Sequence, residues 1–433
     1  MTSNGDEKKK YKFLFVTKEA LSSDLAWQIT KEGHNVKFFC GEQPEKDVGD
    51  GFIEKIDNWE QHKDWADVIL FDDIGFGAKA DQLRKEGKFV VGGSSYTDNL
   101  ELDRKFGQAE LKDAGVTILP YANFTSFDEA IAFVKANPDK YVIKPSGEIQ
   151  DEKELLFVGR EENGNDVLQV LEHYKTTWSK KIKEFLIQKV AEGVEVAVGA
   201  FFNGKNFITP ININFEHKRL FPDEIGPSTG EMGTSMYWTK SSPIFESTLL
   251  KAKEKLVASG YVGYIDINCI VNGRGIYPLE WTSRFGYPTI SIQMEGIVSE
   301  WGQFLYDIAQ GKDAQLKAKK GYQIGVVIAI PPFPFEDPKA FKKYSEGAAI
   351  LFKHQNPDGI HIGEVKRIEN EWYIAGESGY ALIVTGAGAT MSEAIQKAYQ
   401  NVKNIMMPNM FYRSDIGQRW FRDCDMLLSW GYF

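Results

Sequence analysis

The segment at residues 263–288, GYIDINCIVNGRGIYPLEWTSRFGYP, constrains the fold of this chain most, because it places acids inside apolar strands. Its pattern predicts strands at residues 264–271 and 276–281 around a glycine-containing turn. Asp266 lies in the first strand, and Glu280 ends the second. An acid in an apolar strand is costly to desolvate without a compensating charge. We therefore expect the two acids to face a common cation.

The two acids of this hairpin are hard oxygen ligands, which suit Mg²⁺ that also carries nucleotide phosphates. Arg284 follows Glu280 by four residues and precedes the flexible Gly286, so its guanidinium could clamp an anion near the metal. The segment therefore predicts a magnesium–nucleotide site. A half-exposed hairpin with solvated acids is the alternative that these residues leave open.

The chain has 433 residues, more than one compact domain usually holds, so we expect an α/β and α+β multidomain protein. Apolar strands alternate with helices near the N-terminus, which indicates a doubly wound parallel sheet. Strands at residues 185–190 and 194–202 are predicted to form a hairpin. The predicted order is a disordered start at residues 1–10, a doubly wound domain at 11–101, a small α+β lobe at 102–203, a large lobe at 204–320 and a mixed C-terminal lobe at 321–433.

The composition excludes several classes of protein. A net charge of −10 argues against a general nucleic-acid binder, since affinity for phosphate backbones needs an excess of Lys and Arg. The three cysteines lie far apart with no CxxC pair, which fits a reducing compartment. No apolar run reaches membrane-spanning length, and the polar N-terminus lacks the apolar core of a signal peptide. We expect a cytoplasmic protein that acts on small molecules.

Two further segments carry residues suited to a nucleotide. Lys144 ends a predicted strand before a Pro-Ser-Gly turn, where a lysine can reach phosphate oxygens as a point charge, although many surface strands also end in lysine. Gln188 lies in a strand whose backbone could contact an adenine edge, and Glu195 beyond it could accept from ribose hydroxyls. An ordinary hairpin with exposed acids is an equally open interpretation of that second segment.

The segment at residues 216–233, EHKRLFPDEIGPSTGEMG, predicts an anion site. Three adjacent donors, His217, Lys218 and Arg219, precede a loop that contains three glycines. Glycine lets backbone amides approach a ligand closely, and basic side chains beside such a loop form a coherent anion site.

Together these segments resemble the ATP-grasp superfamily, and within it the glycinamide ribonucleotide synthetase (phosphoribosylamine–glycine ligase) family. FEHKRLFPDEIGPSTGEMG, LEWTSRFGYP and the late FYRSDIGQRW carry the resemblance, and the order of lobes matches from about residue 11 to 420. The resemblance implies a doubly wound domain for the amine substrate, a split ATP-grasp and a C-terminal lobe. It also implies ATP and Mg²⁺ (or Mn²⁺) as cofactors, and a glycyl phosphate that the amine of phosphoribosylamine attacks.

The resemblance also implies a role for individual residues. The nucleotide would contact Lys144, Lys153 in the lid, Gln188, Lys189, Val190 and Glu195. The metal would bind Asp266, Glu280 and Thr282, and the catalytic groups would be Lys218, Arg219 and Arg284. The substrates would contact Ser22, Ser23, His217, Gly226, Ser228, Thr229, Gly230 and Gly233.

The chain departs from the family pattern at several positions. The first loop reads VTKEALSSDLAW where the family has a Gly-rich loop, although Ser22 and Ser23 could still present a helix N-terminus to a phosphate. Thr282 replaces an amide metal ligand, and Tyr287 replaces an acid. These changes leave two alternatives open: a ligase for a different amino acid or amine, and a nucleotide-binding protein without catalysis. The sequence also leaves open whether the protein is a monomer or a homodimer.

Overall fold

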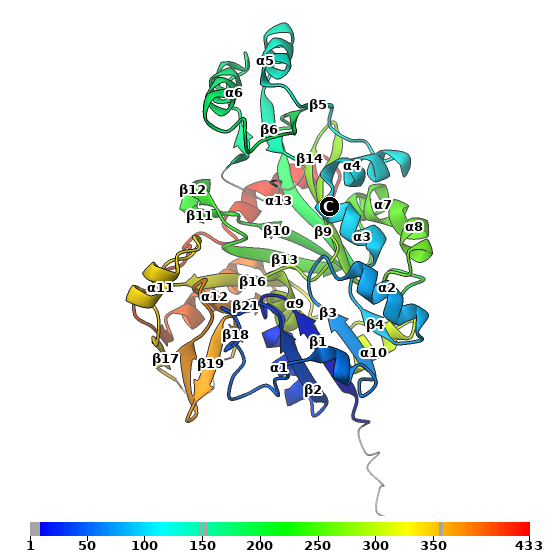
Figure 1. Cartoon of the computed structure of the whole chain (residues 1–433), viewed down its shortest axis with the longest axis vertical. Helices are drawn as coiled ribbons and strands as arrows, with labels where there is room; N and C mark the ends of the chain where they lie inside the picture. The colour runs from blue at the N-terminus through cyan, green and yellow to red at the C-terminus, as the bar shows by residue number, and fades with distance from the viewer. Residues whose placement is uncertain (1–8, 147–148, 150–154, 355–357) are drawn as a thin grey trace, which may run out of the picture.

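The chain folds into a small upper lobe above a broad body built on one large sheet (Figure 1). The computed structural model describes residues 9–146, 149, 155–354 and 358–433. Lys153, the predicted lid lysine, lies outside the described residues. No helix in the described ranges combines the length and the apolar character needed to cross a membrane.

The N-terminal domain is the predicted parallel sheet, with strand order β2-β1-β3-β4. Residues 13–16 of its first strand are fully buried, which explains their continuous apolar sequence. The strands are β1 (Lys12–Thr17), β2 (Asn35–Cys40), β3 (Val68–Phe71) and β4 (Val90–Val91). The helices of this region are α1 (Ser23–Lys31), α2 (Gly77–Lys85), α3 (Ser95–Leu102) and α4 (Arg104–Asp113).

The small lobe is a four-stranded antiparallel sheet with order β5-β8-β6-β7 and two helices. Phe185 and Ile187 of the sheet pack against Val134 and Leu171 of the helices in a core of their own. The elements are β5 (Tyr121–Phe124), α5 (Phe127–Ala136), β6 (Tyr141–Pro145), β7 (Phe157–Val158), α6 (Asn165–Thr177) and β8 (Phe185–Lys189). This separate core makes the small lobe a packing unit distinct from the body.

The body contains an antiparallel sheet of eight strands in the order β15-β14-β9-β10-β13-β16-β21-β18. The predicted acid hairpin is confirmed as the outermost pair of this sheet, β14 and β15. The strands are β9 (Val194–Phe202), β10 (Ile211–Glu216), β13 (Gly233–Thr239), β14 (Gly263–Asn272), β15 (Gly275–Thr282), β16 (Tyr322–Ala329), β18 (Ile360–Ile362) and β21 (Tyr380–Gly388).

The predicted hairpin of residues 185–190 and 194–202 is wrong. β8 already has a hydrogen-bonded neighbour on each side, β5 and β6, so it offers no free edge to β9. β9 instead pairs with β14 along its whole length and with β10 on its other side. The predicted divisions at residues 203 and 320 consequently fall between strands of one sheet, because β9 and β16 both belong to it.

Helices cover the two faces of the large sheet differently. On one face, α12 (Met391–Val402) lies against Gly386, and Trp420 of α13 (Arg419–Ser429) stacks edge-on against Phe215. On the other face, α9 (Thr289–Gly296) lies against Gly325. The remaining helices of the body are α7 (Pro243–Ser247), α8 (Lys253–Ala258), α10 (Trp301–Ala309) and α11 (Pro338–Tyr344).

A second, smaller sheet completes the C-terminal region with order β19-β20-β17-β22. Its strands are β17 (Ala349–Phe352), β19 (Val365–Ile368), β20 (Glu371–Ile374) and β22 (Ile405–Met406). Trp372 of this sheet packs edge-on against Trp27 of α1, which joins the C-terminal region to the N-terminal domain. The junction brings the first loop of the chain beside β18 and β21.

Candidate functional site

One face of the eight-stranded sheet carries a band of polar side chains. Strand alternation places Asn212, Asn214 and Glu216 of β10 on this face, while Ile211, Ile213 and Phe215 point to the other. The register aligns Asn268 of β14 with Glu280 of β15 and Asp266 with Thr282. Residues directly opposite in an antiparallel pair share a face. The sheet therefore gathers acids and amides from β10, β14 and β15 on one face.

Lys218 lies at the centre of a carboxylate cluster formed by Glu195, Glu216 and Glu280. Its Nζ is 2.8 Å from Glu280 Oε1, 3.3 Å from Glu216 Oε2 and 3.4 Å from Glu195 Oε1. Burial disfavours the charged amine, but attraction to these carboxylates raises the pKa of Lys218 well above its ordinary value. The same ammonium lowers the pKa of Glu280 to about 2. The predicted catalytic lysine and the predicted metal ligand are thus in direct contact.

Asp266 is the second predicted metal ligand, and its side chain is 3% exposed. Burial, then Glu216 and Glu101, raise the pKa of Asp266 well above its ordinary value, and a hydrogen bond from Thr282 opposes that rise. Its Oδ1 has no hydrogen-bond partner among the described residues. A buried carboxylate oxygen that lacks a donor suits a cation.

The described residues contain no group of three or more His, Cys, Asp or Glu side chains arranged to hold a metal alone. Asp266, Glu280 and Thr282 nevertheless offer oxygen donors from two paired strands. These donors fit Mg²⁺ or Mn²⁺ of the kind that takes its remaining ligands from phosphates and water.

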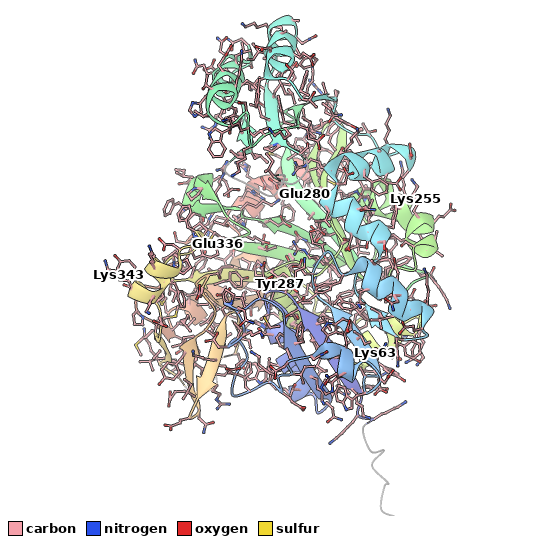
Figure 2. All side chains as sticks on the ribbon, in the orientation of Figure 1. Lys63, Lys255, Glu280, Tyr287, Glu336 and Lys343 are labelled. Atoms are coloured by element: carbon pink, nitrogen blue, oxygen red, sulfur yellow. The ribbon has the colours of Figure 1, made fainter. Side chains whose placement is uncertain are left out.

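Lys144 approaches this cluster from β6 of the small lobe. Burial, then the neighbouring Arg104, lower the pKa of Lys144 to about 8, while Glu280 opposes that shift. Arg104 donates to the carbonyl of Pro145 at 2.6 Å, and so fixes the end of the same strand. Figure 2 labels Glu280 where the small lobe meets the body. Arg104 carries no signal in the sequence, because only the fold brings its charge beside Lys144.

The predicted adenine segment forms the connection between the small lobe and the large sheet. Gln188 is buried, whereas Lys189 points outward and pairs with Asp139 at 2.5 Å. The amide of Val190 donates to the carbonyl of Lys140 at 3.0 Å. Glu195 accepts from Asn268 Nδ2 at 2.8 Å and belongs to the carboxylate cluster. The nucleotide contacts of these residues stay predictions.

The predicted substrate loop is a short hairpin of β11 (Arg219–Phe221) and β12 (Ile225–Ser228). Arg219 donates to the carbonyl of Gly226 at 2.9 Å. Thr229 donates to the carbonyl of Lys218 through both its amide, at 2.8 Å, and its hydroxyl, at 2.9 Å. A side chain at Gly233 would collide with the carbonyl of Gly325. These bonds fix the backbone on which Ser228 and Gly230 lie.

His217 is buried beside Arg419 and Arg413, which disfavour a positive charge on its ring. Burial, then Arg419 and Arg413, lower the pKa of His217 to about 3. Neither ring nitrogen has a hydrogen-bond partner within the described part of the chain. The ring is therefore neutral at physiological pH, and its predicted substrate contact stays a prediction.

Arg413 gives the late FYRSDIGQRW segment a structural role that the sequence did not reveal. Its guanidinium is 1% exposed and donates to the carbonyl of Arg219 at 2.9 Å and to Glu224 at 2.8 Å. It also pairs with Asp415, which accepts from the amide of Asp223 at 3.1 Å. The segment therefore ties the substrate loop to the C-terminal region. The sequence shows only an arginine followed two residues later by an acid, and the burial of Arg413 appears only in the fold.

Arg284 lies at the border with the N-terminal domain. Its Nε is 3.2 Å from Asp73 and 3.2 Å from Glu101, and both carboxylates raise its pKa against the effect of burial. Its NH1 donates to the carbonyl of Phe285 at 3.2 Å. The side chain retains partial exposure of 27%, so a substrate carboxylate would share the guanidinium with these acids. That contact stays a prediction.

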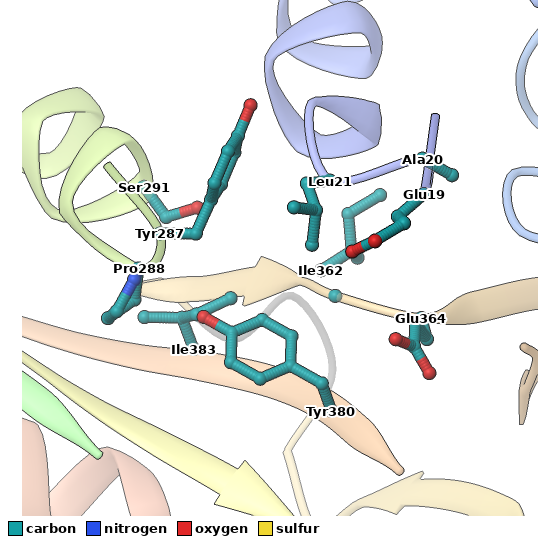
Figure 3. A pocket seen from close by; sticks show the side chains of 11 residues that line it. Glu19, Ala20, Leu21, Tyr287, Pro288, Ser291, Ile362, Glu364, Tyr380 and Ile383 are labelled. Atoms are coloured by element: carbon teal, nitrogen blue, oxygen red, sulfur yellow. The ribbon is translucent and has the colours of Figure 1, made fainter. Parts of the chain in front are cut away.

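A pocket lies where the first loop meets α9 and β18, and we call it the junction pocket (Figure 3). Its lining residues are Glu19, Ala20, Leu21, Tyr287, Pro288, Ser291, Ile362, Gly363, Glu364, Tyr380 and Ile383. Ser22 and Ser23 are buried next to it, where the amide of Ser22 donates to Asp72 at 3.1 Å and the hydroxyl of Ser23 to Gly363 at 3.4 Å.

The junction pocket is acidic. Burial raises the pKa of Glu19, of Asp72 to about 7, and of Glu364 well above its ordinary value. None of the described residues that line the pocket is Lys, Arg or His. The Tyr287 hydroxyl donates to the carbonyl of Asp72 at 3.2 Å, which closes one side of the pocket against the N-terminal domain.

A small antiparallel lobe joined to a larger antiparallel sheet, with a lysine facing carboxylates, is the architecture of the ATP-grasp class. Models of the phosphoribosylglycinamide synthetase ATP-grasp (A) domain and C domain match residues 102–290 and 323–419, together more than half of the chain. The chain belongs to the phosphoribosylglycinamide synthetase family.

Individual relatives agree with this family. A phosphoribosylamine–glycine ligase of Streptococcus pneumoniae is 25% identical over 360 residues, which cover 80% of this chain and 82% of the relative. One from Halalkalibacterium halodurans is 26% identical over 353 residues, 78% of each chain.

Solved structures share the fold. The phosphoribosylamine–glycine ligase of Thermotoga maritima matches with a TM-score of 0.70 at 20% identity, over 94% of this chain and 100% of that one. A biotin carboxylase domain of Hydrogenobacter thermophilus, in complex with MgADP, ADP and bicarbonate, matches with a TM-score of 0.64 at 15% identity. The latter match covers 93% of this chain and 92% of the neighbour.

Proposed function

We propose that this chain is an ATP-dependent ligase that joins glycine to phosphoribosylamine through a glycyl phosphate, with release of ADP and phosphate. The relatives with this name and the family models support the proposal. The observation that carries it is the convergence of Lys144, Lys218 and Glu280 from three segments of the chain. Transfer of a phosphoryl group to a carboxylate requires the repulsion between the two anions to be cancelled. Lys144 and Lys218, with a metal ion held at Glu280, would supply the positive charge for it.

The nucleotide would lie between β6 and the polar face of the large sheet. Lys144 would neutralise phosphate charge, and Lys218 would stabilise the charge that develops on the transferred group. Asp266, Glu280 and Thr282 would hold Mg²⁺ or Mn²⁺, which would add positive charge at the phosphate oxygens. Arg284 would orient the glycine carboxylate by a charge-assisted contact. The reaction needs no protein nucleophile.

Release of ADP tests the proposal. Purified protein is incubated with Mg²⁺-ATP, glycine and phosphoribosylamine generated in situ, and each component is omitted in turn. We expect ADP only in the complete mixture, together with the ligated product by mass spectrometry. Tight ATP binding with no ADP in the complete mixture would contradict the proposed pair of substrates.

A different amine is the second candidate, because the described residues that line the junction pocket include no Lys, Arg or His to bind a phosphate. Phosphate groups are bound by cations or by converging amide donors. A screen of cationic amines, with glycine held constant and ADP measured, separates the candidates. Turnover with a cationic amine that exceeds turnover with phosphoribosylamine would favour the second one.

We further propose that the protein acts in the cytoplasm on small molecules, as a monomer or a homodimer. Cys40 and Cys269 are buried free thiols and Cys424 is a partly exposed one, which suits a reducing compartment. Size-exclusion chromatography with light scattering measures the oligomeric state directly.

A further inference from the structure

The Lys218 ammonium donates to Glu280 at 2.8 Å and is surrounded by the carboxylate cluster. An ammonium has three N–H donors, and the three carboxylates of Glu195, Glu216 and Glu280 lie within 3.4 Å of Nζ. They come from β9, β10 and β15, so the ammonium joins three strands of the sheet. Glu280, the shortest of these contacts, is also the metal ligand in the proposed function.

Binding of a divalent cation to Glu280 weakens the contact of the Lys218 ammonium with the same carboxylate, and the ammonium likewise weakens binding of the cation. A metal would coordinate Glu280 at about 2.1 Å, while the ammonium is 2.8 Å from the Oε1 of that residue. A metal ion bound to Glu280 and the Lys218 ammonium beside it would repel each other strongly, because both are positively charged and close together. We propose that Lys218 is an internal cation that holds the carboxylate cluster until a divalent metal, with or without its nucleotide, displaces it. This inference rests on the metal site of the proposed function.

The structure allows the side chain of Lys218 to leave without moving its backbone. The carbonyl of Lys218 is held by the amide and hydroxyl of Thr229, at 2.8 and 2.9 Å. Its side chain is 30% exposed, and a lysine stem is flexible. Rotation of the stem therefore suffices to release Glu280.

Asn268 keeps the other two carboxylates in place during this exchange. Its Nδ2 is 2.8 Å from Glu195 Oε1 and 3.5 Å from Glu216 Oε2. Those two acids retain a donor when the ammonium leaves, whereas Glu280 becomes available to the metal. The released ammonium then pairs with the nucleotide phosphates. Metal and nucleotide therefore each bind more tightly when the other is present.

Metal binding without nucleotide tests the exchange. Free Mn²⁺ is measured by electron paramagnetic resonance during titration of the wild-type protein and of Lys218→Met. We expect the variant to bind Mn²⁺ at least tenfold more tightly, because the competing cation is gone. Lys255→Met is the matched control, since it removes a lysine that is 2.8 Å from Glu110 outside the site. It should bind Mn²⁺ as the wild type does.

Two results would overturn the inference. One is a Lys218→Met affinity for Mn²⁺ equal to or weaker than that of the wild type. The other is a gain that persists when Glu280→Gln is added to Lys218→Met, because the metal would then bind elsewhere. Neither titration involves glycine or an amine. A failed ligation assay with an intact gain in Mn²⁺ affinity would therefore contradict the proposed function and not this exchange.

Chemical labelling of the wild-type protein gives a second test if Lys218→Met does not fold. Acetic anhydride acetylates accessible amines, and mass spectrometry quantifies each site. We expect saturating Mg²⁺ to raise the acetylation rate of Lys218 severalfold, with Lys255 unchanged as the internal reference. A Lys218 rate that stays constant at a metal concentration that saturates the protein would overturn the inference.

Discussion

Glu280 is the residue on which the metal assignment depends. Glu280→Ala should lower the rate of ADP release by more than about 100-fold, because a missing charge at the transferring phosphate costs several kcal/mol. The melting temperature should change little, since the side chain is 51% exposed. Glu60→Ala, at an exposed ion pair with Lys79, is the control. A Glu280→Ala protein with full activity would disprove the metal assignment.

Arg284 is the residue expected to grip the substrate carboxylate. Arg284→Ala should lower kcat/KM for glycine by more than about tenfold, the loss of one charge-assisted contact. Arg284→Lys keeps the charge and should restore part of the activity. Steady-state kinetics at varied glycine measure both. Unchanged kinetics in Arg284→Ala would assign the guanidinium to the structural contacts with Asp73 and Glu101 alone.

Asp72 should make stability depend on pH. Burial raises its pKa from 3.8 to about 7, so the folded protein binds this proton where the unfolded chain has released it. The contribution of Asp72 to the free energy of unfolding therefore falls as pH rises from about 4 to 7. Asp72→Asn should raise the melting temperature by a few degrees at pH 8, and the gain should vanish as pH falls toward 4. A gain that is independent of pH would contradict the titration.

At the scale of elements, Arg413 should keep the β11–β12 hairpin in its folded conformation. Arg413→Ala removes bonds to the carbonyl of Arg219 and to two acids, and breaking a buried pair costs about 3–5 kcal/mol. We expect a lower melting temperature and faster amide exchange across residues 219–228. Arg422→Ala is the control, because that guanidinium is 71% exposed. Amide exchange in Arg413→Ala that is as slow as in the wild type would show that the hairpin stays ordered without Arg413.

The two predicted hairpins show which elements a sequence determines. β14 and β15 were predicted correctly because a short glycine turn brings neighbouring strands together locally. β8 and β9 were predicted wrongly because β8 takes both of its partners from earlier in the chain, β5 and β6, and β9 pairs with β10 and with the distant β14. Gly199 of β9 illustrates the non-local cause: a side chain there would collide with Tyr264 of β14. This constraint on strand pairing can be found in the structure and not in the sequence.

The candidate site was predictable in part. Resemblance and strand pattern identified Lys144, Lys218, Asp266 and Glu280, and the fold brings Lys144 and Lys218 near Glu280. Glu216 and Asn268 were missed as members of the cluster, because an acid and an amide in separate strands carry no pairing signal. The acidity of the junction pocket was missed for the same reason, since Glu19 and Glu364 are far apart along the chain.

At the scale of the whole molecule, the small lobe and the body differ in how they are built. The small lobe has its own core, whereas eight strands drawn from residues 194–388 share one sheet. A chain ended after residue 320 would lack β16, β21 and β18 and would expose the edge of β13.

This continuity limits how such a protein can change by recombination. A crossover near residue 320 would join the carboxylate-bearing strands to foreign strands whose register and side chains must match β13 along its length. The small lobe can be exchanged or remodelled as a unit, because its buried residues pack in a separate core. The small lobe can thus change by replacement of a module, whereas the carboxylate-bearing strands must change by point substitution within an inherited sheet.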